Sequence, residues 1–543
     1  MNTNIATRMM RQGYAMLAAL AFIAGMLTAC VGRGGGNTDA DANASDSIEQ
    51  SEAYIPTMEE LTLPDTAYAS VAAMNYIVDC VDSLPRPLKY YDDLYLQRKG
   101  ERVMTFRHNL RRNADFGGRV EGTPSEIEVA WSFDTPYGHA ETQFGAWGGG
   151  TGWTGQPLYA HWTEAEMDSI RRGGAPLTAD FAPEEVMVGS LCGQAFFLNF
   201  QTGRQSRQSL DLHNVVKGTM SMDPELMNLY VGQGVNKGEP LGCQAFSLTS
   251  HRRGTFFNDP SAWRSWQAFD ASSIVAGGYL FWTAENGSVY KFEREEGGVI
   301  RRVATMRYRV GGMAPGIESS LCVYRNYGYC SDNRGNVVCV NLNTMKPVWY
   351  YNNHDDSDGT IVCREEEGTP YIYTACEVDK QGDTGTCHFV KLNALNGDLV
   401  WEQPIPCSRI DLGQKILDGG MYSTPLLGQG NCENLIFANV CRNRAHPDRG
   451  QLMALNTADG TIVYTVGYGN FCWSSPVAFL NENDEMFIFT GDASGNAYLI
   501  RGSNGEVLCR KQMEANFESS PCVVGNSAVV GCRGTKIYKF VIK

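Results

Sequence analysis

The feature that most constrains the fold is a short, aromatic-rich strand that recurs eight times. The copies are Gln194–Leu198, Gln244–Leu248, Ser288–Phe292, Val337–Asn341, His388–Leu392, Gln451–Leu455, Ala497–Ile500 and Lys536–Phe540. Seven intervals separate the first copy from the last, so the mean spacing is about 49 residues, which is typical of propeller blades. We therefore predict an all-β, eight-bladed β-propeller of four-stranded antiparallel blades. Seven blades is the alternative, because the first two units carry insertions.

The remaining strands of a blade can be read around each copy. Two small polar residues precede an apolar strand, as at Ser319-Ser320 and Ser519-Ser520, and a Gly-containing turn after the copy leads into an outer strand, as in Asn396–Trp401. The last unit ends close to Lys543 and has only three strands. The segment Ile127–Asp134 alternates like an outer strand but has no blade of its own. We predict that it pairs with the C-terminal sheet and closes the ring, which removes exposed strand edges.

The ending Leu392–Trp401 resembles the repeat of the PQQ-like, quinoprotein-type β-propeller family, whose blades end in a docking Trp. The segment Thr105–Asn113 is similar to the one that opens many such chains. The resemblance covers Met104 to Lys543, although Tyr464 and Cys509 replace the Trp in two copies. The resemblance implies the fold. The resembled family also includes outer-membrane assembly lipoproteins that carry the same repeat. The resemblance does not by itself imply an activity, because the fold serves both dehydrogenases and scaffolds.

The N-terminus predicts export and lipid anchoring. Residues 1–29 combine early arginines, a short apolar run and Leu-Thr-Ala before Cys30, which resembles a bacterial lipoprotein signal peptide. We predict lipidation of Cys30; an ordinary signal peptide with an incidental cysteine is the alternative. Val31 lacks the Asp typical of inner-membrane retention, so we expect attachment to the periplasmic face of the outer membrane, with membrane contact through the anchor only. Residues 30–53 are rich in Gly, Asn, Asp and Ser and are predicted to be a flexible tether.

Residues 54–126 are predicted to be a partly helical extension, followed by the propeller at 127–543. Within this extension, apolar residues recur at helical spacing from Tyr68 to Leu84, and Pro85 ends the pattern. This spacing predicts a helix that braces the propeller.

Cysteine usage admits two interpretations. Apart from Cys30 there are sixteen cysteines, an even number that would suggest disulfides in an exported protein. Their positions follow the blade register, however, where a thiol packs as a small apolar side chain. Buried free thiols are the preferred interpretation. Cross-strand disulfides, with Cys322/Cys330 and Cys522/Cys532 as the first candidates, are the alternative.

Motifs for catalysis or cofactor binding are scarce. Catalytic quinoproteins of the resembled family use a ring of two adjacent cysteines over PQQ together with a calcium ion, and this chain has no Cys-Cys pair. We therefore expect no PQQ and no calcium. Asp355, Asp356 and Asp358, beside His354, partly resemble a calcium loop, but their spacing favours a solvated hairpin tip. The net charge of −15 without a basic stripe argues against nucleic-acid binding.

One group of residues suggests a binding surface. Five tryptophans fall in Gly-rich or long connections of the first two units, where loops would project from one rim: Trp147, Trp153, Trp162, Trp263 and Trp266. Exposed aromatic side chains suit stacking on a glycan or gripping a partner. The leading hypothesis is a non-enzymatic, lipid-anchored scaffold that binds an envelope protein. The alternatives are a glycan- or small-ligand-binding module that uses this rim, and an atypical quinone-dependent dehydrogenase.

Overall fold

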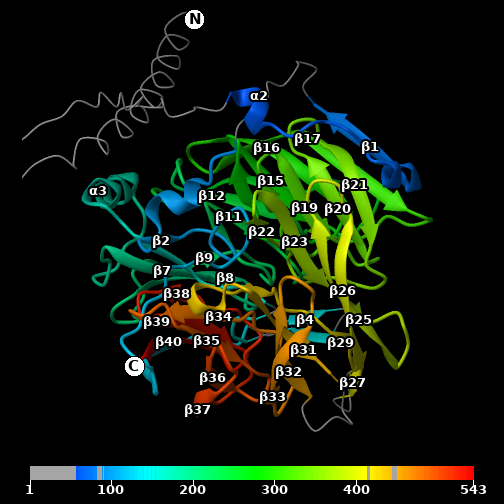
Figure 1. Ribbon diagram of the computed structural model, residues 1–543. Helices are drawn as coiled ribbons and strands as arrows, with labels where there is room; N and C mark the ends of the chain where they lie inside the picture. Colours follow the sequence, from blue (N-terminus) through cyan, green and yellow to red (C-terminus); the bar gives the residue numbers. More distant parts are fainter. Residues whose placement is uncertain are drawn as a thin grey trace, which may run out of the picture. The chain divides into compact units, whose positions relative to one another are not determined.

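The computed structural model describes residues 57–543 except 82–88, 90, 139, 143–144, 148, 153, 412–415 and 443–448. It shows an eight-bladed β-propeller of antiparallel sheets, as predicted (Figure 1). The signal peptide, Cys30 and the tether lie outside the described residues and stay predictions. None of the described helices has the length and apolar character needed to cross a membrane.

Each blade runs from an innermost strand at the axis to an outermost strand at the periphery. The first four blades are β6 (Leu158–His161), β7 (Glu184–Gly189), β8 (Gln194–Asn199), β9 (Leu210–Asp211); β10 (Ser221–Met222), β11 (Asn228–Gly232), β12 (Cys243–Ser247), β13 (Arg253–Phe257); β14 (Ile274–Ala276), β15 (Tyr279–Ala284), β16 (Ser288–Glu295), β17 (Val299–Val310); and β18 (Cys322–Tyr324), β19 (Tyr327–Ser331), β20 (Asn336–Asn341), β21 (Lys346–Asn352).

The other four blades complete the ring. They are β22 (Val362–Glu366), β23 (Thr369–Ala375), β25 (Thr384–Asn393), β26 (Leu399–Ser408); β30 (Leu426–Leu427), β31 (Leu435–Cys441), β32 (Gly450–Asn456), β33 (Ile462–Tyr468); β34 (Val477–Leu480), β35 (Met486–Gly491), β36 (Asn496–Arg501), β37 (Val507–Gln512); and β38 (Cys522–Val524), β39 (Ser527–Cys532), β40 (Lys536–Ile542), β3 (Ile127–Asp134). Short additional strands are β2 (Arg102–Val103), β4 (Ala140–Thr142), β5 (Gly145–Trp147), β24 (Glu377–Val378), β27 (Ile410–Asp411), β28 (Ile416–Leu417) and β29 (Gly419–Gly420).

All eight copies of the recurring phrase form the third strand of a blade, which explains their regular spacing. The predicted closure is confirmed as well. Strand β3 pairs antiparallel with β40, with Trp131 opposite Lys539 and Ser132 opposite Tyr538. The last blade thus contains strands from both ends of the propeller, and the ring closes through backbone hydrogen bonds.

Outer-strand tryptophans dock several of the blades onto the next one. The Trp349 indole N–H donates to the Ala394 carbonyl at 3.0 Å, and the indole of Trp401 donates to that of Thr457 at the same distance. The indole lies over the turn glycine of the following blade. A Cβ on Gly397, whose φ is +78°, would lie 2.7 Å from the Trp349 ring. Only glycine combines that left-handed backbone with the close approach of an indole.

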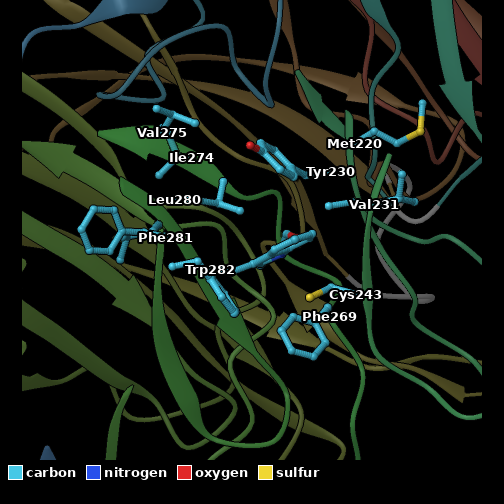
Figure 2. Close-up of a cluster of buried hydrophobic side chains, with 14 of the residues drawn as sticks. Met220, Tyr230, Val231, Cys243, Phe269, Ile274, Val275, Leu280, Phe281 and Trp282 are labelled. Carbon is cyan, nitrogen blue, oxygen red and sulfur yellow. The ribbon is translucent and has the colours of Figure 1, made fainter. Parts of the chain in front are cut away.

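Aromatic side chains fill the space between neighbouring blades. Figure 2 shows the interface of the second and third blades, where Trp282 lies among apolar side chains. Its indole N–H donates to the Ala271 carbonyl at 2.8 Å, and its ring meets that of Phe269 edge-on at 5.6 Å between centroids. The polar atom of the indole is therefore satisfied while the ring is buried, as a core Trp requires.

The predicted bracing helix in the extension is wrong. The described part of that segment forms a 3-10 turn, η1 (Ala69–Ala73), and then strand β1 (Met74–Cys80). Met74, Tyr76 and Val78 alternate with exposed residues, a period of two that the helical interpretation overlooked. The described helices near it are short: α2 (Met58–Leu61) and η2 (Leu94–Arg98), while the longer α3 (Glu164–Gly173) lies in the first blade. A further 3-10 turn, η3, spans Gly430–Cys432.

The preferred interpretation of the cysteines agrees with the structure. All sixteen described cysteines are free, including Cys322, Cys330, Cys522 and Cys532, and fourteen of them are buried. The buried thiols serve as small apolar side chains within the blades.

Candidate functional site

A ring of hydroxyl side chains surrounds the propeller axis. At the start of five innermost strands, the backbone N–H donates to a Ser or Thr hydroxyl of the next blade. The bonds are Ser272 to Ser320 at 2.8 Å, Ser320 to Thr360 at 3.0 Å, Thr360 to Thr424 at 3.2 Å, Thr424 to Ser475 at 3.0 Å and Ser475 to Ser520 at 3.1 Å. This geometry explains why small hydroxyl residues recur at these positions.

The segment that precedes the propeller crosses one end of this ring. Arg107 is fully buried and donates to the carbonyls of Pro476 at 2.7 Å and Pro425 at 3.1 Å. Arg112, also fully buried, donates to the Leu321 carbonyl at 2.9 Å. Burial lowers the pKa of Arg107 to about 9 and that of Arg112 to about 10. The two guanidinium groups satisfy carbonyls that the innermost strands leave unpaired, so this segment closes the channel at that end.

An acidic basin lies beside the ring, and we define it by Asp270, Glu285, Glu318, Asp356, Asp358 and Glu377, together with Lys217. Lys217 contacts Asp270 directly, and its Nζ lies 3.3 Å from Glu318 Oε2 and 3.8 Å from Glu285 Oε1. Burial opposes the charge on Lys217, but these three carboxylates outweigh it and raise its pKa. Lys217 is therefore the cation around which this half of the acidic basin is organised.

The other half of the acidic basin contains Asp356, Asp358 and Glu377, whose oxygens lie within 4.8 Å of one another. Lys380 Nζ bonds with Asp356 at 3.0 Å. Burial is the main cause that raises the pKa of Asp356, to about 6. Burial, reinforced by Asp358 and Asp356, raises the pKa of Glu377 well above its usual range. Protonation is thus one way in which the excess of carboxylates is accommodated.

The predicted solvated hairpin tip at Asp355, Asp356 and Asp358 is wrong. Asp355 is fully buried, and its carboxylate accepts the backbone N–H groups of Asp379 and Lys380 at 3.0 Å. Asp356 and Asp358 face the acidic basin. The segment is the crossing from an outer strand to the next innermost strand, and acids there are held by backbone donors, which a pattern of spacing alone cannot reveal.

The acidic basin does not fit PQQ. PQQ carries three carboxyl groups on a flat tricyclic quinone and needs cationic partners, whereas the acidic basin is itself carboxylate-rich. The cavity at the axis, lined by residues that include Phe106, Asp270 and Asp358, measures about 20 Å³, which is room for about one water molecule. Carboxylates are the donors that Ca²⁺ takes, so the chemistry of the acidic basin suits this ion better than PQQ. In the half of the basin around Asp270, however, Lys217 already supplies a positive charge.

Asp356 and Asp358 were singled out from the sequence, but the other four acids of the acidic basin were not, although the sequence holds a signal for two of these four. An acid stands one or two residues before the paired hydroxyl positions in several blades: Asp270 before Ser272, Glu318 before Ser319 and Asp358 before Thr360. A residue at the same place in each repeat lies at the same end of the channel. Lys217 likewise stands two residues before the hydroxyl of Thr219. Glu285 and Glu377 lie outside this register and reach the acidic basin from other connections.

The predicted tryptophan rim does not form one surface among the described residues. Trp162 is buried, and its indole N–H donates to Glu185 at 3.0 Å, so its ring is part of the first blade's core. Trp263 is 36% exposed and lies beneath Arg309, with 5.2 Å between the guanidinium carbon and the ring centroid. Trp266, three residues further on, is partly buried. Trp147 ends β5, and the placement of its side chain and of Trp153 lies outside the described residues.

The outer edges of the blades form a second candidate site. A peripheral strand presents unpaired N–H and C=O groups, which attract another strand unless charge, proline or a covering segment protects them. Strand β17 is covered by β1, which pairs with it from Met74–Val310 to Cys80–Ala304 (Figure 1). Strand β21 is covered by the turn before β1, where the Tyr68 N–H donates to the Val348 carbonyl at 2.8 Å. Strand β13 is covered by the start of β17, where the Ile300 N–H donates to the Thr255 hydroxyl at 3.1 Å.

Four further edges carry protection within their own sequence. Strand β9 is two residues long. The protecting side chains of the other three are Pro404 and Pro406 in β26, Arg510 and Lys511 in β37, and Glu128 and Asp134 in β3.

Among the described outer strands, β33 alone lacks every one of these devices. Its seven residues, Ile462–Tyr468, contain no charge and no proline. Ile462 and Val463 are 42% and 53% exposed, and Thr465 and Gly467 are exposed as well. In the described chain no backbone hydrogen bond is found on its outer side. This β33 edge is therefore an unprotected site for strand addition.

Compared by sequence, the chain matches no protein-family model and none of the curated proteins. Solved structures are similar in fold. Quinohemoprotein alcohol dehydrogenase ADHIIG from Pseudomonas putida HK5 has a TM-score of 0.56 at 12% identity, covering 82% of this chain and 81% of that chain. BamB from Moraxella catarrhalis has a TM-score of 0.45 at 13% identity, covering 68% and 95%. The chain thus has the fold of the quinoprotein-type β-propellers.

Proposed function

We propose that this protein is a non-enzymatic, lipid-anchored β-propeller of the bacterial cell envelope that binds a partner protein along the β33 edge. The observation that carries the proposal is the contrast between β33 and the seven other outer strands, each of which is covered, short, charged or interrupted by proline. The carboxylate-rich lining of the axial cavity, which includes Asp270, Glu318 and Asp358, argues against the quinone cofactor because PQQ itself carries three carboxyl groups.

The mode of binding has a precedent within the chain. Strand β1 adds to the outside of β17 over seven residue pairs in a continuous antiparallel register, so a blade of this propeller accepts a fifth strand. The same addition at β33 would satisfy its outward N–H and C=O groups. Strand addition of this kind derives its affinity from main-chain hydrogen bonds and its specificity from alternate side chains.

The β33 edge also indicates the chemistry of its occupant. Ile462, Val463 and Thr465 are exposed and uncharged, so a charged strand laid against them would gain no charge partner. We infer an extended segment of an envelope protein with β-branched or aromatic residues at alternate positions. The tether of this chain is an unsuitable occupant because residues 31–53 are dominated by small polar and acidic residues.

The test combines capture with a backbone measurement. The full chain is cross-linked in intact cells and purified, and the recovered partner is identified and reconstituted with it. Ile462→Lys places a charge on the β33 edge and is expected to lower recovery at least tenfold. In the reconstituted pair, hydrogen exchange is expected to slow at the amides of β33.

The matched control is Val507→Lys, because Val507 occupies the equivalent position of the next blade and is 44% exposed. It is expected to leave recovery unchanged. Equal loss in both variants, or slowed exchange elsewhere with none in β33, would overturn the proposal. Pairing of two copies of this chain through β33, detected as a dimer by light scattering, would also contradict the proposed occupant.

A further inference from the structure

Two of the eight histidines meet at the junction of the fourth and fifth blades. His354 follows β21, His388 lies in β25 and Glu402 lies in β26. The imidazole centroids of His354 and His388 are 4.1 Å apart, and His388 Nδ1 lies 2.6 Å from Glu402 Oε1. One ligand atom from each of the three side chains lies within 4.8 Å of the other two. We propose that His354, His388 and Glu402 form a binding site for a divalent transition-metal ion, with Zn²⁺ as the reference ion.

The donor set selects the class of metal. Two imidazoles and one carboxylate are the three protein ligands typical of an open zinc site, which keeps a fourth position for water. Imidazole nitrogen favours Zn²⁺, Cu²⁺ and Ni²⁺ over Ca²⁺ and Mg²⁺, which take oxygen donors. This cluster therefore differs in chemistry from the acidic basin, whose ligands are all carboxylates.

The backbone holds the three residues in place before a metal arrives. His388 and Glu402 are diagonal neighbours on paired strands, since Val390 lies opposite Glu402 and His388 lies opposite Pro404. The backbone N–H of His388 donates to the Cys376 sulfur at 3.2 Å, which fixes the strand at this point. Two of the ligands thus come from rigid sheet positions, which favours a preformed site.

The third ligand is held by an unusual backbone conformation. His354 has a φ of +72°, a region that non-glycine residues rarely adopt. Its N–H donates to Asn352 Oδ1 at 2.9 Å, and its neighbours Asn353 and Asp355 are fully buried. Two buried anchors on either side of an exposed, left-handed histidine direct its side chain toward His388. This arrangement gives the strained residue a reason to be present.

Small movements suffice to complete the site. Nitrogen–zinc bonds of about 2.0–2.1 Å at a tetrahedral angle place two ligand atoms about 3.3 Å apart. His388 Nδ1 and Glu402 Oε1 lie 2.6 Å apart, so they must separate by less than 1 Å to ligate the same ion. His354 is exposed and can rotate to supply one ring nitrogen.

The test is a titration of the full chain with ZnCl₂ by calorimetry, together with Co²⁺ absorbance as a report of coordination. We expect one Zn²⁺ per chain at this site and the intense visible bands of four-coordinate Co²⁺. His354→Asn removes the imidazole but keeps a residue that tolerates positive φ. It is expected to weaken binding about tenfold to a hundredfold, and His388→Gln is expected to do the same.

His213 provides the matched control, because its Nδ1 lies 3.3 Å from Asp211 Oδ1 at an exposed position. Among the described residues, His213 and Asp211 form a histidine–carboxylate pair that belongs to no group of three metal-ligating side chains. His213→Asn is expected to leave the affinity and the Co²⁺ spectrum unchanged. Unaltered binding in both His354→Asn and His388→Gln, or an equal loss in His213→Asn, would overturn the proposal. Circular dichroism confirms that each variant is folded.

Discussion

The contact between Gly397 and Trp349 provides a sensitive test of how the blades are held together. Replacing Gly397 by Ala adds one methyl group to a turn whose φ is +78°, and that methyl would lie 2.7 Å from the indole of the preceding blade. The control is Gly368→Ala in the same blade, where φ is +80° and no atom lies within 4 Å of the new methyl. The two substitutions impose the same backbone conformation and differ in the clash with Trp349.

The magnitude follows from that difference. Forcing alanine into the left-handed region costs about 1–2 kcal/mol at either position. Gly397→Ala in addition displaces an indole that is fully buried and hydrogen-bonded at 3.0 Å, and overpacking of this kind costs about 1–3 kcal/mol more. We therefore expect the free energy of unfolding to fall by about 1–3 kcal/mol more in Gly397→Ala than in Gly368→Ala.

The assay is equilibrium urea unfolding followed by circular dichroism, with the variants compared through their midpoints at a common slope. In a Trp349→Ala background the indole is absent, so Gly397→Ala should cost no more than Gly368→Ala. Equal destabilisation by the two glycine variants in the natural background would refute the docking account. So would an excess cost that persists without Trp349, since the clash would then lie elsewhere.

Three further outcomes are expected. Thr424→Val leaves the buried N–H of Thr360 without its acceptor and should lower the free energy of unfolding by about 1–3 kcal/mol in urea, and an unchanged midpoint would contradict the hydroxyl ring. Because the folded pKa of Glu377 lies above its ordinary value of 4.5, the folded state holds the proton longer, and stability falls as pH rises above that value; Glu377→Gln should flatten this decline in melting temperatures measured across pH, and an identical slope would argue against it. A thiol reagent should label Cys80 and partly exposed Cys509 in the native chain and the other described cysteines only after unfolding, whereas disulfides found by mass spectrometry would contradict the free thiols.

The propeller could be predicted because its signals repeat. Each third strand has the same alternation in every unit, and the orphan strand Ile127–Asp134 has one vacant edge to fill. The segment Met74–Cys80 was misread because its apolar residues satisfy both a helical and a two-residue period, and pairing with β17 decided between them. That pairing joins residues more than two hundred positions apart, which local spacing cannot show.

The candidate sites were harder to predict for the same reason. His354, His388 and Glu402 come from two blades, and only the packing of one blade on the next brings their side chains together. The β33 edge is recognised because the other outer strands carry a protecting charge, a proline, a covering segment or a short length, and β33 has none of these. That comparison requires knowing which strand of each unit is outermost and which ones the N-terminal segment covers.

Site-specific photo-cross-linking in living cells tests the central claim most directly. A photoreactive residue is placed at exposed Thr465 on the β33 edge and, in a parallel strain, at exposed Arg510 on the protected edge of β37. The account predicts one dominant adduct with a single envelope protein from position 465 and none from position 510. No adduct at 465, or the same adducts from both positions, would contradict it.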